Sequence, residues 1–235
     1  MDAHVPQCTG VVRMKISPLR QFVLAAALWL PACFFLWAVF SSVIVWPIGK
    51  ASDLILPAML PGTIEGVLQD RFILQIDTLL QTTQSADGRI GLLSFTVNPL
   101  VYAWCMALFC GLVMASPVSV RGRLLQLALG LPVLICVAVW GTVFDCLELL
   151  ALKSGPLGLA AVEQAGWHVE AIALGSQFGY LILPAVTPIA LWVIMNKEFL
   201  EELVGWRGEL DDAGAGPTAT DAGSAGAPSD TTSES

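Results

Sequence analysis

Charge and histidine are scarce in this 235-residue sequence. Only 13% of the residues are charged while 56% are hydrophobic, and the two histidines are His4 and His168. Soluble globular domains carry about 25% charged residues, so the composition excludes an ordinary soluble domain. Together with a mean hydropathy of +0.74, it predicts an integral membrane protein.

Metal-binding and disulfide patterns are also missing. No CxxC or HxxxH motif occurs in the sequence. Asp145 and Glu148 stand one helical turn apart, which is typical of a wetted helix face. Four cysteines fall within apolar runs, and the other two, Cys8 and Cys146, are predicted to lie on opposite sides of the membrane. We therefore expect no catalytic residue, metal, cofactor or disulfide, and no nucleic-acid partner.

Long apolar runs are what the sequence has instead. Four of them, 22–48, 99–116, 124–144 and 171–195, carry no charged residue except near their ends, and about 20 helical residues cross a hydrocarbon core. Backbone groups inside a bilayer must pair within the segment, so these runs predict helices. The first run is too long for a signal peptide and lacks a small-x-small cleavage site, so we expect a permanent anchor.

The distribution of cations predicts the orientation. Lys and Arg near a span resist translocation. If all four runs cross the membrane, seven of the eleven Lys and Arg residues fall on the same side of it; they are Arg13, Lys15, Arg20, Arg121, Arg123, Lys197 and Arg207. The other four are Lys50, Arg71, Arg89 and Lys153. Both termini are therefore predicted to be cytoplasmic, with 49–98 and 145–170 outside.

The chain is predicted to have three parts. A cytoplasmic segment covers 1–20, and a four-span membrane domain covers 21–205, including an extracytoplasmic insert at 49–98. The rest, 206–235, is rich in Gly, Ala, Ser, Thr, Pro and acidic residues with hardly a large apolar side chain. Such a composition cannot offset the entropy of ordering, so we expect a disordered acidic tail.

The insert changes its pattern along the chain. Residues 49–69 have helical spacing interrupted by prolines, which predicts a broken amphipathic helix on the outer membrane surface. Residues 70–81 and 90–97 alternate between apolar and polar, and the polar segment 82–88 ends in Asp87-Gly88. This pattern predicts a β-hairpin with one apolar side. The fold class is therefore mainly α, a polytopic helix bundle with a small αβ insert.

Asn98-Pro99 joins the second predicted strand to the second span. A residue before proline favours extended backbone, and proline suits the first turn of a helix. The junction would hold the hairpin near the lipid headgroups. Two roles stay open for the hairpin, which either caps the helix bundle or offers a strand edge to an extended peptide.

Two activities compete with a structural role. Cys146 and His168 both fall on the predicted outer side, and a thiol peptidase needs such a pair, because imidazole draws the proton from sulfur. A small-solute transporter would use polar side chains within the spans, with Gln177 and Tyr180 as the residues to test. Such polar groups more often tie helices together.

The stretch 29–153 resembles a known family. It contains "VIVWPIG", then "FTVNPLVYAWCMALFCGLVMASP" and "GLPVLICVAVWGTVFDCLELL", of which "VNPLVY" and "AVWGTVFD" are the most specific parts. These segments resemble the exosortase H-associated membrane proteins. The resemblance implies a bacterial inner-membrane protein encoded with an exosortase, a transpeptidase-like enzyme that processes secreted proteins bearing a short C-terminal sorting signal. The exosortase is expected to have eight spans and Cys, Arg and His signatures, which this chain lacks.

We therefore predict a non-enzymatic accessory protein whose partners are the lipid bilayer and an exosortase or its sorting-signal substrate. Eight residues are candidates for contact because of their positions: Arg71, Asp77, Arg89, Asn98, Pro99, Tyr102, Asp145 and His168.

Overall fold

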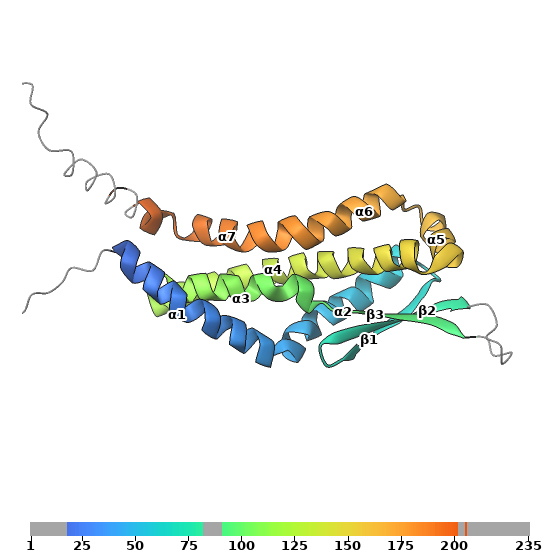
Figure 1. Ribbon diagram of the computed structural model, residues 1–235, viewed down its shortest axis with the longest axis horizontal. Coiled ribbons are helices and arrows are strands. Elements are labelled where there is room, and N and C mark those ends of the chain that lie inside the picture. The colour runs from blue at the N-terminus through green and yellow to red at the C-terminus, as the bar shows by residue number, and fades with distance from the viewer. Residues whose placement is uncertain (1–17, 82–90, 202–204, 206–235) are drawn as a thin grey trace, which may run out of the picture. The chain divides into compact units, whose positions relative to one another are not determined.

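Apolar helices make up most of the structure, and a small sheet lies at one end of them (Figure 1). The computed structural model describes residues 18–81, 91–201 and 205. Predictions that concern 1–17, the turn at 82–88, Arg89 and the acidic tail lie outside these residues. The chain divides after Asn196, and the fold below is that of the unit that ends there.

Three helical segments are long and apolar enough to cross a membrane: 19–39, 120–153 and 169–195. The first is α1 (Pro18–Val39). The second is α4 (Val120–Glu148), continued without a break by the π-helical segment η1 (Leu149–Lys153). The third joins α6 (Val169–Gln177), the π-helical η2 (Phe178–Ile182) and α7 (Leu183–Met195).

The shorter apolar helix α3 (Leu100–Ala115) lies among these long segments and packs against α1, α4 and α7. Its buried side chains include Tyr102, Phe109 and Val113. Gly111 permits the approach of α1, since a Cβ at this position would lie 2.6 Å from the Leu30 Cδ2 atom. The predicted helix at 99–116 is thus present, with a length of 16 residues.

The first predicted span was drawn too long. Instead of one helix over 22–48, the helix ends at Val39, and α2 (Ser41–Met59) starts after Phe40, whose φ of −92° and ψ of 17° leave the helical range. Beyond this bend α2 packs on α4 and on the sheet and buries Val45, Ile48 and Leu56. Hydropathy does not detect the bend, because the chain is apolar on both sides of Phe40.

The insert also differs from its prediction. The expected helix over 49–69 ends at Met59, and 64–69 belong to a strand, β1 (Ile64–Asp70). Two further strands, β2 (Ile73–Gln81) and β3 (Leu92–Val97), complete an antiparallel sheet in the order β1-β2-β3. The predicted two-stranded hairpin is therefore the β2–β3 part of a three-stranded sheet.

Alternation along β2 decides which face of the sheet is buried. Leu74, Ile76 and Thr78 are buried, and Leu74 and Ile76 pair with Val97 and Phe95 of β3. Arg71 and Phe72, predicted as strand, form the turn between β1 and β2, where Arg71 adopts a φ of 56°. Although Ile64–Asp70 is helical in its spacing, this two-residue turn lets it pair with Ile73–Thr78 and thereby form an additional strand.

Side chains from four helices meet at the end of the helices opposite the sheet. The Phe22 ring stacks on Trp192 with centroids 5.4 Å apart, and the Trp192 indole donates to the Ser116 hydroxyl at 2.8 Å. The Gln126 amide donates to the Asn196 side-chain oxygen at 3.1 Å. This cluster joins the start of α1, the α3–α4 connection and the end of α7. The remaining helix, α5 (Gly155–Gln164), follows η1 at the sheet end (Figure 1).

Candidate functional site

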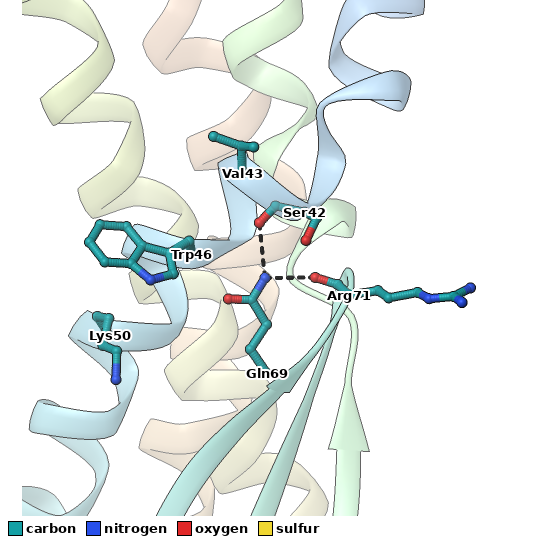
Figure 2. A pocket seen from close by; sticks show the side chains of 6 residues that line it. All are labelled: Ser42, Val43, Trp46, Lys50, Gln69 and Arg71. Atoms are coloured by element: carbon teal, nitrogen blue, oxygen red, sulfur yellow. Dashed lines mark hydrogen bonds between the residues drawn. The ribbon is translucent and has the colours of Figure 1, made fainter.

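A groove of about 550 Å³ lies between α2 and the β1–β2 turn (Figure 2). We call it the Trp46 groove; it is lined by Ser42, Val43, Trp46, Lys50, Gln69 and Arg71. The residues at 43, 46 and 50 share one helix face because they are three and four positions apart. Trp46 is 61% exposed, so a large aromatic surface is available to a ligand.

Gln69 sets the geometry of the groove. Its side-chain amide donates to the Ser42 carbonyl at 2.9 Å and to the Arg71 carbonyl at 2.6 Å. One side chain from β1 therefore ties the β1–β2 turn to the first turn of α2, as Figure 2 shows. Asp53 makes a second tie between helix and sheet, because its carboxylate accepts a hydrogen bond from the Val67 backbone N–H at 2.9 Å.

The groove has a positive charge and an aromatic wall. Among the residues that the structure describes, no carboxylate lines it. Lys50 stands one turn beyond Trp46 on α2, whereas the Arg71 side chain extends away from both (Figure 2). An ammonium group beside an indole suits a ligand with both an anionic and an apolar part. Such a ligand would be a peptide end or an acidic side chain next to an apolar one.

A second polar cluster lies deeper, between α3, α4 and α6. The Tyr102 hydroxyl donates a hydrogen bond to the Asp145 carboxylate, and the Tyr102 ring meets the Tyr180 ring edge to face, with centroids 6.3 Å apart. The Ser176 hydroxyl donates to Glu148. In each pair the hydroxyl and the carboxylate come from different helices, so these bonds tie α3 and α6 to α4.

The structure brings two of the predicted contact residues, Tyr102 and Asp145, directly together, and Arg71 lines the Trp46 groove. Asp77 lies on β2 and accepts a hydrogen bond from the Gln75 amide at 2.9 Å. These residues do not form one site. Tyr102 and Asp145 serve the helix contacts, whereas Arg71 belongs to the sheet end.

Three other predicted contact residues lie at the starts of helices. The Asn98 side chain accepts a hydrogen bond from the Leu100 N–H at 3.1 Å, and Pro99 is buried at the start of α3. His168 is exposed just before α6. Sequence reasoning missed Trp46 and Gln69. The spacing of Val43, Trp46 and Lys50 was a usable signal, but nothing in the sequence indicates that Gln69 reaches Ser42.

The two residues of the thiol peptidase hypothesis differ in environment. Cys146 is 2% exposed on α4, and His168 is exposed between α5 and α6. Gln177 and Tyr180, from the transporter hypothesis, are exposed on α6 and η2. A thiolate nucleophile must reach its substrate, which the burial of Cys146 opposes.

We therefore expect Cys146→Ala to leave processing of a sorting-signal substrate in cells at the wild-type rate, as judged by immunoblot. Alanine fits the buried site without adding a polar group. Cys136→Ala, at an exposed position on the same helix, is the matched control. A loss of processing in Cys146→Ala alone, with normal protein levels, would support the peptidase.

These features define a class, an α-helical membrane protein with apolar membrane helices and a small sheet at one end. The model of the exosortase H-associated membrane protein family matches residues 16–199. The chain belongs to this family, as its resemblance predicted, and it is a membrane protein associated by that description with exosortase H. Neither curated proteins nor solved structures gave a significant match.

Proposed function

We propose that this protein is a non-enzymatic accessory of exosortase H that contacts the enzyme or its substrate on the outer face of the bacterial inner membrane. The Trp46 groove is the observation that carries the proposal, because it exposes an aromatic ring and a cation at the sheet end of the membrane helices. The family description, which names exosortase H, supports the choice of partner.

The cation distribution supports one orientation in the membrane. Arg20, Arg121 and Arg123 flank the helix ends that the Phe22–Trp192 contact and the Trp192–Ser116 hydrogen bond bring together. Cations concentrate on the cytoplasmic side of membrane proteins. In our proposal this end is cytoplasmic, so the sheet, the Trp46 groove and α5 are outside, and both termini are cytoplasmic.

Four spans follow if α3 also crosses the bilayer. At one end Tyr102 packs on Gly141, and at the other the Arg123 guanidinium donates to the Ser116 carbonyl at 3.0 Å. Between Arg123 and Gly141, α4 advances about 27 Å at 1.5 Å per residue. The 16 residues of α3 themselves advance about 24 Å, so α3 accompanies α4 through most of a hydrocarbon core about 30 Å thick.

Besides the Trp46 groove, one edge of the sheet is available for the contact. The outer edge of β1 is partly occupied, because the Val67 N–H bonds to Asp53. The outer edge of β3 has no strand partner among the described residues. An extended segment of a substrate or of the enzyme can pair with this edge, and its side chains would then run along a sheet that ends at the Trp46 groove.

The test combines a gene deletion with charge reversal in the groove. We expect deletion to abolish processing of a sorting-signal substrate, and Lys50→Glu to reduce it about tenfold, since repulsion replaces attraction for an anionic group. Lys153→Glu makes the same charge change at an exposed position of the sheet end and is the control. The measurement is the ratio of processed to unprocessed substrate on immunoblots.

Crosslinking identifies the partner. A photoreactive phenylalanine analogue at position 46 should capture the exosortase or its substrate in cells, whereas one at Leu28, exposed on α1, should not. Normal processing in the deletion strain would refute the accessory role. Equal processing in Lys50→Glu and Lys153→Glu would show that the Trp46 groove takes no part in that role.

A further inference from the structure

A second groove, within the membrane part, is not used by the function proposed above. It measures about 310 Å³ and lies where α1, α2, α3 and α4 meet. We call it the Trp37 groove. Its lining is apolar apart from two thiols and one indole N–H; it consists of Cys33, Leu36, Trp37, Phe40, Ile44, Pro47, Met106, Ala107, Cys110, Leu131 and Ile135.

The bend at Phe40 creates this groove. Because α1 ends at Val39 and α2 turns away to pack on the sheet, Phe40, Ile44 and Pro47 form part of its wall. Trp37 lies about 26 Å along α1 from Arg20 at 1.5 Å per residue, close to the far boundary of a 30 Å core. Leu131 lies only about 12 Å along α4 from Arg123. The groove therefore runs from the membrane boundary toward the middle of the bilayer.

Trp37, which lines this groove, has one polar atom without a partner among the described residues. The indole Nε1 of Trp37 is buried, and no acceptor among the described residues bonds to it. The indole nitrogens of Trp140 and Trp192 by contrast donate to the Gly175 carbonyl and the Ser116 hydroxyl. A buried donor without an acceptor is destabilising, so an occupant that brings an acceptor to Trp37 and apolar atoms to the rest would complete the site.

Size decides between the apolar occupants that a membrane offers. A cavity of about 150 Å³ holds a benzene ring, so 310 Å³ has room for about twice as many carbon atoms. One turn of a helix about 10 Å wide with a 5.4 Å pitch occupies roughly 420 Å³, which exceeds the groove. A flexible chain fits this space, whereas a neighbouring helix does not enter it.

From these observations we propose that the Trp37 groove binds one acyl chain of a diacyl phospholipid, with an ester carbonyl of the lipid accepting a hydrogen bond from Trp37 Nε1. The ester groups of a phospholipid lie at the boundary where Trp37 is found, and the chain below them follows the groove toward Leu131. The lipid acts as an acceptor for the one buried indole N–H without a partner among the described residues, and it fills the space left by the bend.

The experiment uses the full-length protein purified in mild detergent and exposed to a diester phosphatidylglycerol. Native mass spectrometry measures the fraction of protein that retains one lipid. We expect Leu131→Trp, which fills the groove, to lower retention at least tenfold. Leu129→Trp makes the same change at a lipid-exposed position of α4 and should retain lipid as wild type does. Thermal unfolding checks that both variants are folded.

A diether lipid with the same headgroup and chains tests the ester contact. Wild type should bind the diester about fivefold more tightly than the diether, the ratio expected for one hydrogen bond, and Trp37→Phe should bind both alike. Equal retention by Leu131→Trp and Leu129→Trp would overturn the acyl-chain site. An equal preference for the diester in wild type and Trp37→Phe would overturn the role of Trp37. Photocrosslinking from position 135 to a polypeptide, either a second copy or another protein, would also overturn the proposal.

Discussion

Replacing Gly141 by valine should destabilise the protein by about 3 kcal/mol, the upper end of the usual cost of overpacking. A Cβ at this position would lie 2.3 Å from the Tyr102 ring, too close for any side chain. Tyr102 has little freedom to yield, since it is buried, contacts Tyr180 and bonds to Asp145. Valine would therefore separate α3 from α4 or break the Tyr102–Asp145 hydrogen bond.

Thermal unfolding in detergent measures the effect of Gly141→Val, which we expect to lower Tm by about 10 °C. Ala128→Val on the same helix adds bulk at an exposed position and should leave Tm within about 2 °C of wild type, since surface substitutions cost little. Equal Tm values for the two variants would mean that α3 does not approach α4 as closely as described.

Trp192→Ala should cost about 3–5 kcal/mol, as large aromatic truncations in packed interiors do. Trp192 is 7% exposed, stacks on Phe22 and donates to the Ser116 hydroxyl, so it connects α1, α3 and α7. In a bilayer helices associate through packing and hydrogen bonds, and the substitution removes both at a point where three helices meet.

Trp46→Ala is the matched control for Trp192→Ala, because Trp46 is mostly exposed in its groove. The measurement is thermal unfolding together with the yield of protein in the membrane fraction. Trp192→Phe should fall between alanine and wild type, since it keeps a ring but loses the N–H donor. Trp192→Ala as stable as Trp46→Ala would contradict the proposed role of the cluster at that end.

Hydropathy and alternation predicted much of the fold. The helices at 100–115, 120–148 and 169–195 agree with the apolar runs, since long runs without charge leave few alternatives to a helix. The strand ending at Val97 and the helix starting at Leu100 agree with the Asn98-Pro99 junction. The local chemistry of proline and asparagine is sufficient there.

Tertiary contacts explain what the sequence did not predict. The bend at Phe40 separates two apolar helices, and the reason for it, the packing of α2 on α4 and β1, involves residues far along the chain. Ile64–Asp70 has helical spacing, yet pairing with Ile73–Thr78 makes it a strand. For short apolar segments, periodicity alone does not decide between helix and strand.

In the candidate sites too, the sequence indicates single residues, whereas tertiary contacts determine which residues come together. The sequence indicates Tyr102 and Asp145 separately, by their positions near span ends, whereas their contact follows from the close packing at Gly141. The Trp46 groove depends on the Gln69 amide reaching Ser42, 27 residues away. No sequence pattern specifies a contact of this kind.

The unbroken run of α4 into η1 has a consequence for the height of the sheet end. Its 34 residues make a rod about 50 Å long at 1.5 Å per residue, some 20 Å more than a hydrocarbon core requires. This extra length of helix packs beside α2 and α5. In the orientation proposed above, this extra length would hold the β-strands at a constant distance from the membrane surface.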